Sequence, residues 1–250
     1  MWRFLHKLAS PPHFYDLSAK MIPWFVIPGL ALVAYGTFAG LFMAPADYQQ
    51  GDAFRIIYVH VPSAYLSMMT YMIMAISAGI GLIWRIKLSH AVAAAAAPIG
   101  AWFTFLALIT GSIWGRPMWG TWWEWGDPRL TSQLIMLFIY FGYMALRSAI
   151  DDPVKADKSS AVLAMVGAVN IPIIHFSVEW WSSLHQGATI IREGGPAMPP
   201  EMLIPLLANI FGFTFLFGAL LLGRVRTEVL FRERRKRWVR HMVLPQGDAG

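Results

Sequence analysis

Residues 91–113 have the sequence AVAAAAAPIGAWFTFLALITGSI, which contains no Asp, Glu, Lys or Arg. At a rise of 1.5 Å per residue, a helix of about 20 such residues crosses the roughly 30 Å hydrocarbon layer of a bilayer. Five other stretches of the chain have the same character. The sequence therefore predicts one all-α integral membrane domain, a bundle of six transmembrane helices. The expected spans are about 21–43, 62–84, 91–113, 132–146, 161–178 and 202–222.

The overall composition also indicates a membrane protein. The 250 residues are 57% hydrophobic and only 14% charged, which leaves too little polar surface to cover a water-soluble core of this size. The basic excess, a net charge of +6, gathers in the tail at 223–250. Because this tail follows a span, it favours anionic membrane lipid over nucleic acid as its partner. We expect residues 224–241 to form an amphipathic helix on the inner membrane surface.

The distribution of Lys and Arg predicts the orientation, because basic residues of short loops are retained in the cytoplasm. Placing both termini there puts the N-terminal arm, with Arg3 and Lys7, and the basic tail inside. It leaves only four of the 20 Lys and Arg residues outside. These four are Arg55, Arg116, Arg129 and Arg192. The first apolar stretch is longer than the core of a signal peptide, so we expect it to be an uncleaved helix.

Two features of the spans concern packing. The small residues at 91–97 would let neighbouring helix backbones approach closely. Pro172 removes one backbone hydrogen bond and should kink the fifth span near that point.

The second outer loop, 114–131, has the sequence WGRPMWGTWWEWGDPRLT and contains five of the chain's 12 tryptophans. Tryptophan favours the membrane interface, but an interfacial belt does not require five on one loop. The glycines and prolines of this loop favour a tightly folded structure. A rigid, flat surface of indole rings suits a flat aromatic ligand. The alternative is that the tryptophans anchor the loop at the membrane interface and dock another protein. The tryptophans are Trp114, Trp119, Trp122, Trp123 and Trp125.

Two outer histidines, His60 and His185, flank this loop in the predicted topology. With no acidic cluster nearby, they suit haem iron better than a hard cation. We place Pro62 in the first turn of the second span, so His60 would lie near the positive end of a helix and keep a free lone pair. His175 is a rival ligand to His185, or a polar group that faces Asn170 or another helix. The remaining histidines are expected to be solvated or lipid-facing: His6, His13, His90 and His241.

Haem carries two propionates, which need cationic or dipolar partners in a low-dielectric setting. Arg55 and Arg129 are our candidates because they lie nearest in sequence to His60 and to the tryptophans. The second, fourth and sixth spans begin on the same outer face, where helix N-termini favour anions. We expect Thr131 and Ser132 to cap the fourth span.

Three segments resemble the CcmC family of bacterial cytochrome c maturation, which carries a tryptophan-rich "WWD" signature. They are WGTWWEWGDPR at 119–129, YVHVP at 58–62 and EWWSSLHQG at 179–187. The resemblance extends over essentially the whole chain. It implies that His60 and His185 are axial ligands of haem b at the periplasmic face of the inner membrane. It also implies that the tryptophan loop, including Asp127, contacts the porphyrin.

The family loads haem onto the periplasmic chaperone CcmE and works with the ABC-type subunits CcmA and CcmB and the small protein CcmD. The resemblance therefore implies a binding and delivery protein with no catalytic residues of its own. A b-type cytochrome that transfers electrons is the alternative, although it would call for histidine pairs within spans. A coupled transporter would be expected to carry ionisable residues in its spans, and no phosphate-binding loop for ATP is present.

Overall fold

The computed structural model describes residues 10–187, 189–190 and 192–243, and all regular structure there is helical. Within this part of the chain, the only β interaction is an isolated bridge between Asp47 and Gly51. Six segments are long and apolar enough to cross a membrane, which confirms the predicted fold class. Each expected span lies within one of them. They are Pro11–Met43, Asp52–Trp84, Lys87–Trp119, Pro128–Ala149, Pro153–Trp180 and Pro200–Glu233.

The helices extend beyond the expected spans at one or both ends. Pro62 lies inside a helix and not in its first turn, because the chain is already helical from Asp52 onward. The helices are α2 (Pro11–Phe38), continued by the π-helical η1 (Ala39–Met43); the 3-10 helix η2 (Asp52–Ile56), continued by α3 (Ile57–Trp84); α4 (Lys87–Trp119); α5 (Pro128–Ala149); α6 (Pro153–Gly167); α7 (Asn170–Trp180); α8 (Pro200–Glu233); and α9 (Arg237–Val243).

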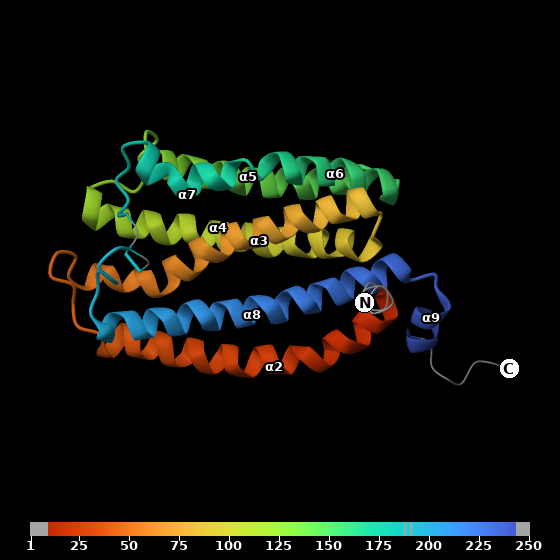
Figure 1. The fold of residues 1–250 in the computed structure, drawn as a ribbon, viewed down its shortest axis with the longest axis horizontal. Helices are drawn as coiled ribbons and strands as arrows, with labels where there is room; N and C mark the ends of the chain where they lie inside the picture. The colour runs from red at the N-terminus through yellow and green to blue at the C-terminus, as the bar shows by residue number, and fades with distance from the viewer. Residues whose placement is uncertain (1–9, 188, 191, 244–250) are drawn as a thin grey trace.

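The helices form three layers: α2 with α8, α3 with α4, and α5 with α6 and α7 (Figure 1). Small residues allow the close packing within the first two layers. A Cβ at Gly36 of α2 would lie 2.7 Å from Oδ1 of Asn209 on α8, so glycine is required for this approach. The alanines at 91, 93 and 95–97 of α4 are all buried, as expected for a small-residue packing surface.

The fifth span is broken between α6 and α7, which confirms the kink predicted from Pro172. Pro172 has no N–H to donate to the carbonyl of Ala168, four residues earlier. That carbonyl instead accepts a hydrogen bond of 3.1 Å from Ile171 N–H. The side chain of Asn170 donates to the carbonyl of Ser132 at 2.8 Å. The break is therefore held against α5.

The two ends of the bundle differ in their connections. One end, which we call the loop end, carries residues 44–51, 120–127, 181–187, 189–190 and 192–199 (Figure 1). The opposite end carries the short connections 85–86 and 150–152, the first residues of α2, and α9. His60, His185 and the tryptophan-rich loop all belong to the loop end.

The basic tail differs from the expected surface helix. The helix α8 continues to Glu233, and only α9 turns away from it. Val225 and Val229 are buried in a cluster with Ala91 and Ala95 of α4. The first half of the tail therefore packs on the bundle and does not lie on the membrane surface. Arg3, His6, Lys7 and residues 244–250 lie outside the described residues.

His90, expected to be solvated or lipid-facing, is half-buried against α3. A Cβ at Gly81 of α3 would lie 2.7 Å from Cε1 of His90 on α4. The imidazole therefore packs directly on the α3 backbone, and this contact between α3 and α4 depends on glycine at position 81.

Four charged side chains join α5, α6 and α8 at the opposite end, and we call them the ionic cluster. Asp157 pairs with Arg147 and, at 2.8 Å, with Arg232. Glu228 accepts from Arg147 at 2.7 Å and from Arg232 at 2.8 Å. Each side chain is at most 23% exposed, so the four charges neutralise one another where water is scarce.

Candidate functional site

The tryptophan-rich loop is partly helical. Trp114 and Trp119 lie on the last turns of α4, which ends at Gly120 with a positive φ of 78°. Their rings meet edge to face with centroids 5.0 Å apart. Trp123 and Trp125 form a second such pair at 5.5 Å. Four of the five indoles of this loop therefore form two edge-to-face pairs and not the single flat surface expected from the sequence.

The members of the second pair differ in exposure. Trp123 packs against the main core cluster, whereas Trp125 is 73% exposed and its neighbour Trp122 is 57% exposed. The indole N–H of Trp114 donates to Oε1 of Gln50 at 2.9 Å. This bond joins α4 to the first outer loop.

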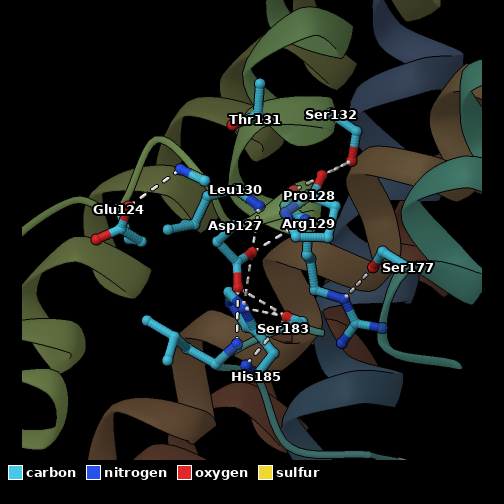
Figure 2. Close-up of polar contacts among 12 residues, drawn as sticks. Glu124, Asp127, Pro128, Arg129, Leu130, Thr131, Ser132, Ser177, Ser183 and His185 are labelled. Atoms are coloured by element: carbon cyan, nitrogen blue, oxygen red, sulfur yellow. Dashed lines mark hydrogen bonds and ion pairs between the residues drawn. The ribbon is translucent and has the colours of Figure 1, made fainter. Parts of the chain in front are cut away.

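Asp127 lies at the centre of the loop end (Figure 2). One carboxylate oxygen accepts hydrogen bonds of 3.0 Å from the N–H groups of Arg129 and Leu130. The other accepts bonds of 2.8 Å from the hydroxyl of Ser183 and the N–H of Leu184. Burial opposes ionisation, but these hydrogen bonds outweigh it and lower the pKa of Asp127. The carboxylate therefore holds two loops together across the site.

These bonds correct the cap expected for the fourth span. Asp127 is the N-cap of α5, and Pro128 is its first residue. Thr131, one expected cap, donates instead to the carbonyl of Trp125 at 3.0 Å. Ser132 donates to the carbonyl of Pro128 at 2.5 Å within the first turn. The capping position shifted because the helix begins earlier than the expected span.

His185 lies beside Asp127 in the third outer loop (Figure 2). Its Nδ1 is 3.4 Å from Oδ1 of Asp127, and its ring meets Trp119 edge to face at 4.9 Å between centroids. Burial lowers the pKa of His185 despite the neighbouring carboxylate. No hydrogen bond engages Nε2 among the described residues. The geometry therefore presents a neutral imidazole whose Nε2 is free to bind a metal.

His60 lies in the first turns of α3, against α4. Its Nδ1 is 2.9 Å from Oγ1 of Thr110. The hydroxyl of Thr110 donates to the carbonyl of Leu106 at 2.6 Å. A Cβ at Gly111 would lie 3.2 Å from Cε1 of His60, so the ring rests on the α4 backbone. Thr110 and Gly111 could not be predicted as part of the site, because they belong to an uninterrupted apolar span with no motif.

The two candidate ligands share α4 as their support. His60 contacts Thr110, and His185 contacts Trp119. Nine residues of helix separate these contacts, which corresponds to roughly 13 Å along the axis. The structure thus brings together at one end two side chains from opposite halves of the sequence.

The two candidate arginines lie in different surroundings. Nε of Arg129 donates to Oγ of Ser177 at 3.1 Å, and Nη2 donates to the carbonyl of His175 at 3.2 Å. The charge of Arg129 also acts on both His60 and His185. Arg129 therefore belongs to the histidine site.

Arg55 is directed toward η1. Its guanidinium pairs with Asp52 at 2.9 Å and donates to the carbonyl of Gly40 at 2.8 Å. His175, the rival ligand, is exposed and packs its ring on Phe176 at 4.7 Å between centroids. Among the residues that the structure covers, no group of three His, Asp or Glu side chains could hold a metal ion.

The comparisons with known proteins agree over nearly the whole chain. A family model described as Heme exporter protein C (CcmC) matches residues 4–240. The chain is 49% identical over 247 residues to heme exporter protein C of Escherichia coli K12, covering 99% of both proteins. The protein of that name from Haemophilus influenzae is 49% identical over 243 residues, covering 97% of this chain and 98% of its own. That from Paracoccus denitrificans is 44% identical over 224 residues, covering 89% and 92%. The chain therefore belongs to the heme exporter protein C family.

Proposed function

We propose that this protein binds haem b at the loop end, with His60 and His185 as axial ligands, and delivers it to the chaperone CcmE for cytochrome c maturation. One observation carries this proposal. Both imidazoles lie at the same end of the bundle, each with Nδ1 directed to a protein group and Nε2 without a hydrogen bond among the described residues. A porphyrin supplies four ligands to iron, so only two protein ligands are needed.

The surroundings of the histidines fit a haem as cargo. The supports of the two histidines lie at different levels of α4, roughly 13 Å apart along its axis. Trp114 and Trp119 line this part of α4, and the exposed Trp122 and Trp125 offer apolar surface beside it. Trp123 packs on the core behind them and holds the loop in place. We assign these five indoles to the porphyrin contact.

The propionates require cations, and the surroundings favour Arg129 over Arg55. Arg129 lies within electrostatic reach of both histidines, whereas Arg55 is engaged by Asp52 and Gly40. Asp127 takes no direct part in haem contact in this proposal, because its oxygens are occupied by four protein donors. It acts through His185, as a carboxylate does behind a metal-bound imidazole.

The loop end faces the periplasm in this proposal, with both termini in the cytoplasm of a bacterial inner membrane. The basis is the distribution of Lys and Arg along the sequence. CcmA, CcmB and CcmD are the proposed partners, and membrane lipid surrounds the exposed apolar side chains. Delivery requires positioning of the cargo and not a catalytic side chain.

Alanine substitutions at His60 and His185 test the proposal. Each should weaken haem retention by the purified protein and abolish transfer to CcmE, followed by visible spectra of both proteins. His175→Ala is the matched control, because His175 lies at the same end but outside the pair; it should retain and transfer haem normally. Unchanged transfer in both ligand variants would contradict the assignment. Haem that stays on the protein and only cycles its redox state would favour the b-type cytochrome alternative.

A further inference from the structure

The two proposed ligands differ in the group that faces Nδ1. Nδ1 of His185 faces both the carboxylate of Asp127 at 3.4 Å and the hydroxyl of Ser183 at 3.5 Å. Nδ1 of His60 faces a hydroxyl, that of Thr110 at 2.9 Å. A carboxylate that accepts a hydrogen bond from Nδ1–H makes Nε2 of the imidazole a stronger metal ligand. A neutral hydroxyl in the same place strengthens Nε2 as a ligand less than a carboxylate does. The two sides of the site are therefore chemically unequal.

The hydrogen-bond network assigns the tautomer of His60. A hydroxyl has one proton. The hydroxyl of Thr110 donates its proton to the carbonyl oxygen of Leu106 at 2.6 Å, because a carbonyl oxygen can only accept a hydrogen bond. Threonine commonly makes this bond to the carbonyl four residues earlier in a helix. The proton between Thr110 and His60 must then come from Nδ1. His60 is thus held with Nδ1–H toward Thr110 and with Nε2 unprotonated.

We propose that Thr110 is a positioning residue for His60, and that His60 is the weaker of the two iron ligands and the first to be exchanged. This inference rests on the proposed function. In the exchange, the bond between iron and Nε2 of His60 breaks, and a lone pair from the incoming donor replaces it. No electron is transferred, and His185 keeps its bond throughout. Asymmetric ligation lets a delivery protein retain its cargo and still release it.

The experiment measures how fast cyanide replaces an axial ligand in the purified protein loaded with ferric haem b. In Thr110→Val, the Nδ1–H of His60 loses its hydroxyl acceptor at nearly unchanged volume, and replacement should be about tenfold faster. Thr110→Ser restores the hydroxyl and should return to within about twofold of the original rate. Thr104→Val is the matched control, because Thr104 is a buried threonine of the same helix that bonds only the carbonyl of Gly100.

A second measurement ranks the ligands directly. Haem affinity is measured for His60→Gly and His185→Gly, with and without added imidazole to fill the cavity. His60→Gly should retain more affinity than His185→Gly, and imidazole should restore the low-spin spectrum of both. Equal losses, or a greater loss in His60→Gly, would overturn the ranking. Equal cyanide rates in Thr110→Val and Thr104→Val would overturn the role of Thr110. If neither glycine variant changed the haem spectrum, the proposed function itself would fail, which is a separate outcome.

Discussion

The N–H of Leu184 donates to Oδ2 of Asp127 at 2.8 Å, joining the third outer loop to the start of α5. The same carboxylate caps α5 and contacts His185. A single buried side chain therefore couples the tryptophan-rich loop to the loop that carries a proposed ligand. This coupling makes the site depend on residues that do not contact the cargo.

Asp127→Ala should remove both the N-cap of α5 and the hydrogen bonds from Ser183 and Leu184 that join the two loops. Loss of the cap costs about 1 kcal/mol, and each buried donor left without a partner adds about 1–3 kcal/mol. We also expect haem affinity to fall by about tenfold or more, because His185 loses the group that orients it. Thermal unfolding and haem titration measure the two effects.

Asp152→Ala is the matched control for that substitution. Asp152 caps α6 at the opposite end and accepts bonds of 2.8 Å from the N–H groups of Val154 and Lys155. The Asp152→Ala substitution should destabilise the first turn of α6 and leave haem affinity unchanged. Equal loss of affinity in the two variants would show that capping in general, and not the contact with His185, is responsible.

Gly111→Ala should displace His60. The added Cβ would lie 3.2 Å from Cε1 of the imidazole, and Cε1 is bonded to the nitrogen that we propose binds iron. We expect haem affinity to fall by about tenfold, with an altered visible spectrum. Gly142→Ala is the control, because its Cβ would meet only Leu163 at an ordinary 3.7 Å. An unchanged haem affinity in Gly111→Ala would argue against the proposed position of the His60 ring on the α4 backbone.

Arg129→Gln should abolish the preference for haem over its propionate dimethyl ester. A hydrogen bond to a charged group contributes about 1.5–3 kcal/mol, or roughly tenfold to a hundredfold in affinity. The variant should bind both compounds with similar affinity, and Arg55→Gln should keep the preference because that side chain is directed toward Gly40. The reverse result would assign the propionates to Arg55.

Asp157→Ala should destabilise the fold without affecting the site. It leaves Arg147 and Arg232 of the ionic cluster with only Glu228 as a partner, and loss of one member of a buried pair costs about 3 kcal/mol. Chemical unfolding should show this loss, and the haem spectrum should not change because the cluster lies at the opposite end. Lys158→Gln alters a neighbouring exposed charge and should have no measurable effect on stability. A changed haem spectrum in Asp157→Ala would reveal coupling between the two ends.

Some structural details followed from chemistry local to the sequence. The break at Ala168 follows from Pro172 because a missing N–H acts on a carbonyl four residues away. The end of α4 at Gly120 follows from the left-handed backbone that glycine permits. The start of α5 was misplaced, since capping by Asp127 depends on where the helix begins and not on the polarity of Thr131 and Ser132.

The sequence by itself determined the number of membrane helices and the presence of tryptophans and histidines near their ends. The reason is that the bilayer requires long uncharged helices, whatever their arrangement. Only the tertiary structure decided which groups support the histidines. Thr110 and His60 lie on different helices, as Asp127 and His185 lie on different loops. Such contacts depend on packing between distant segments, which no local pattern of residues encodes.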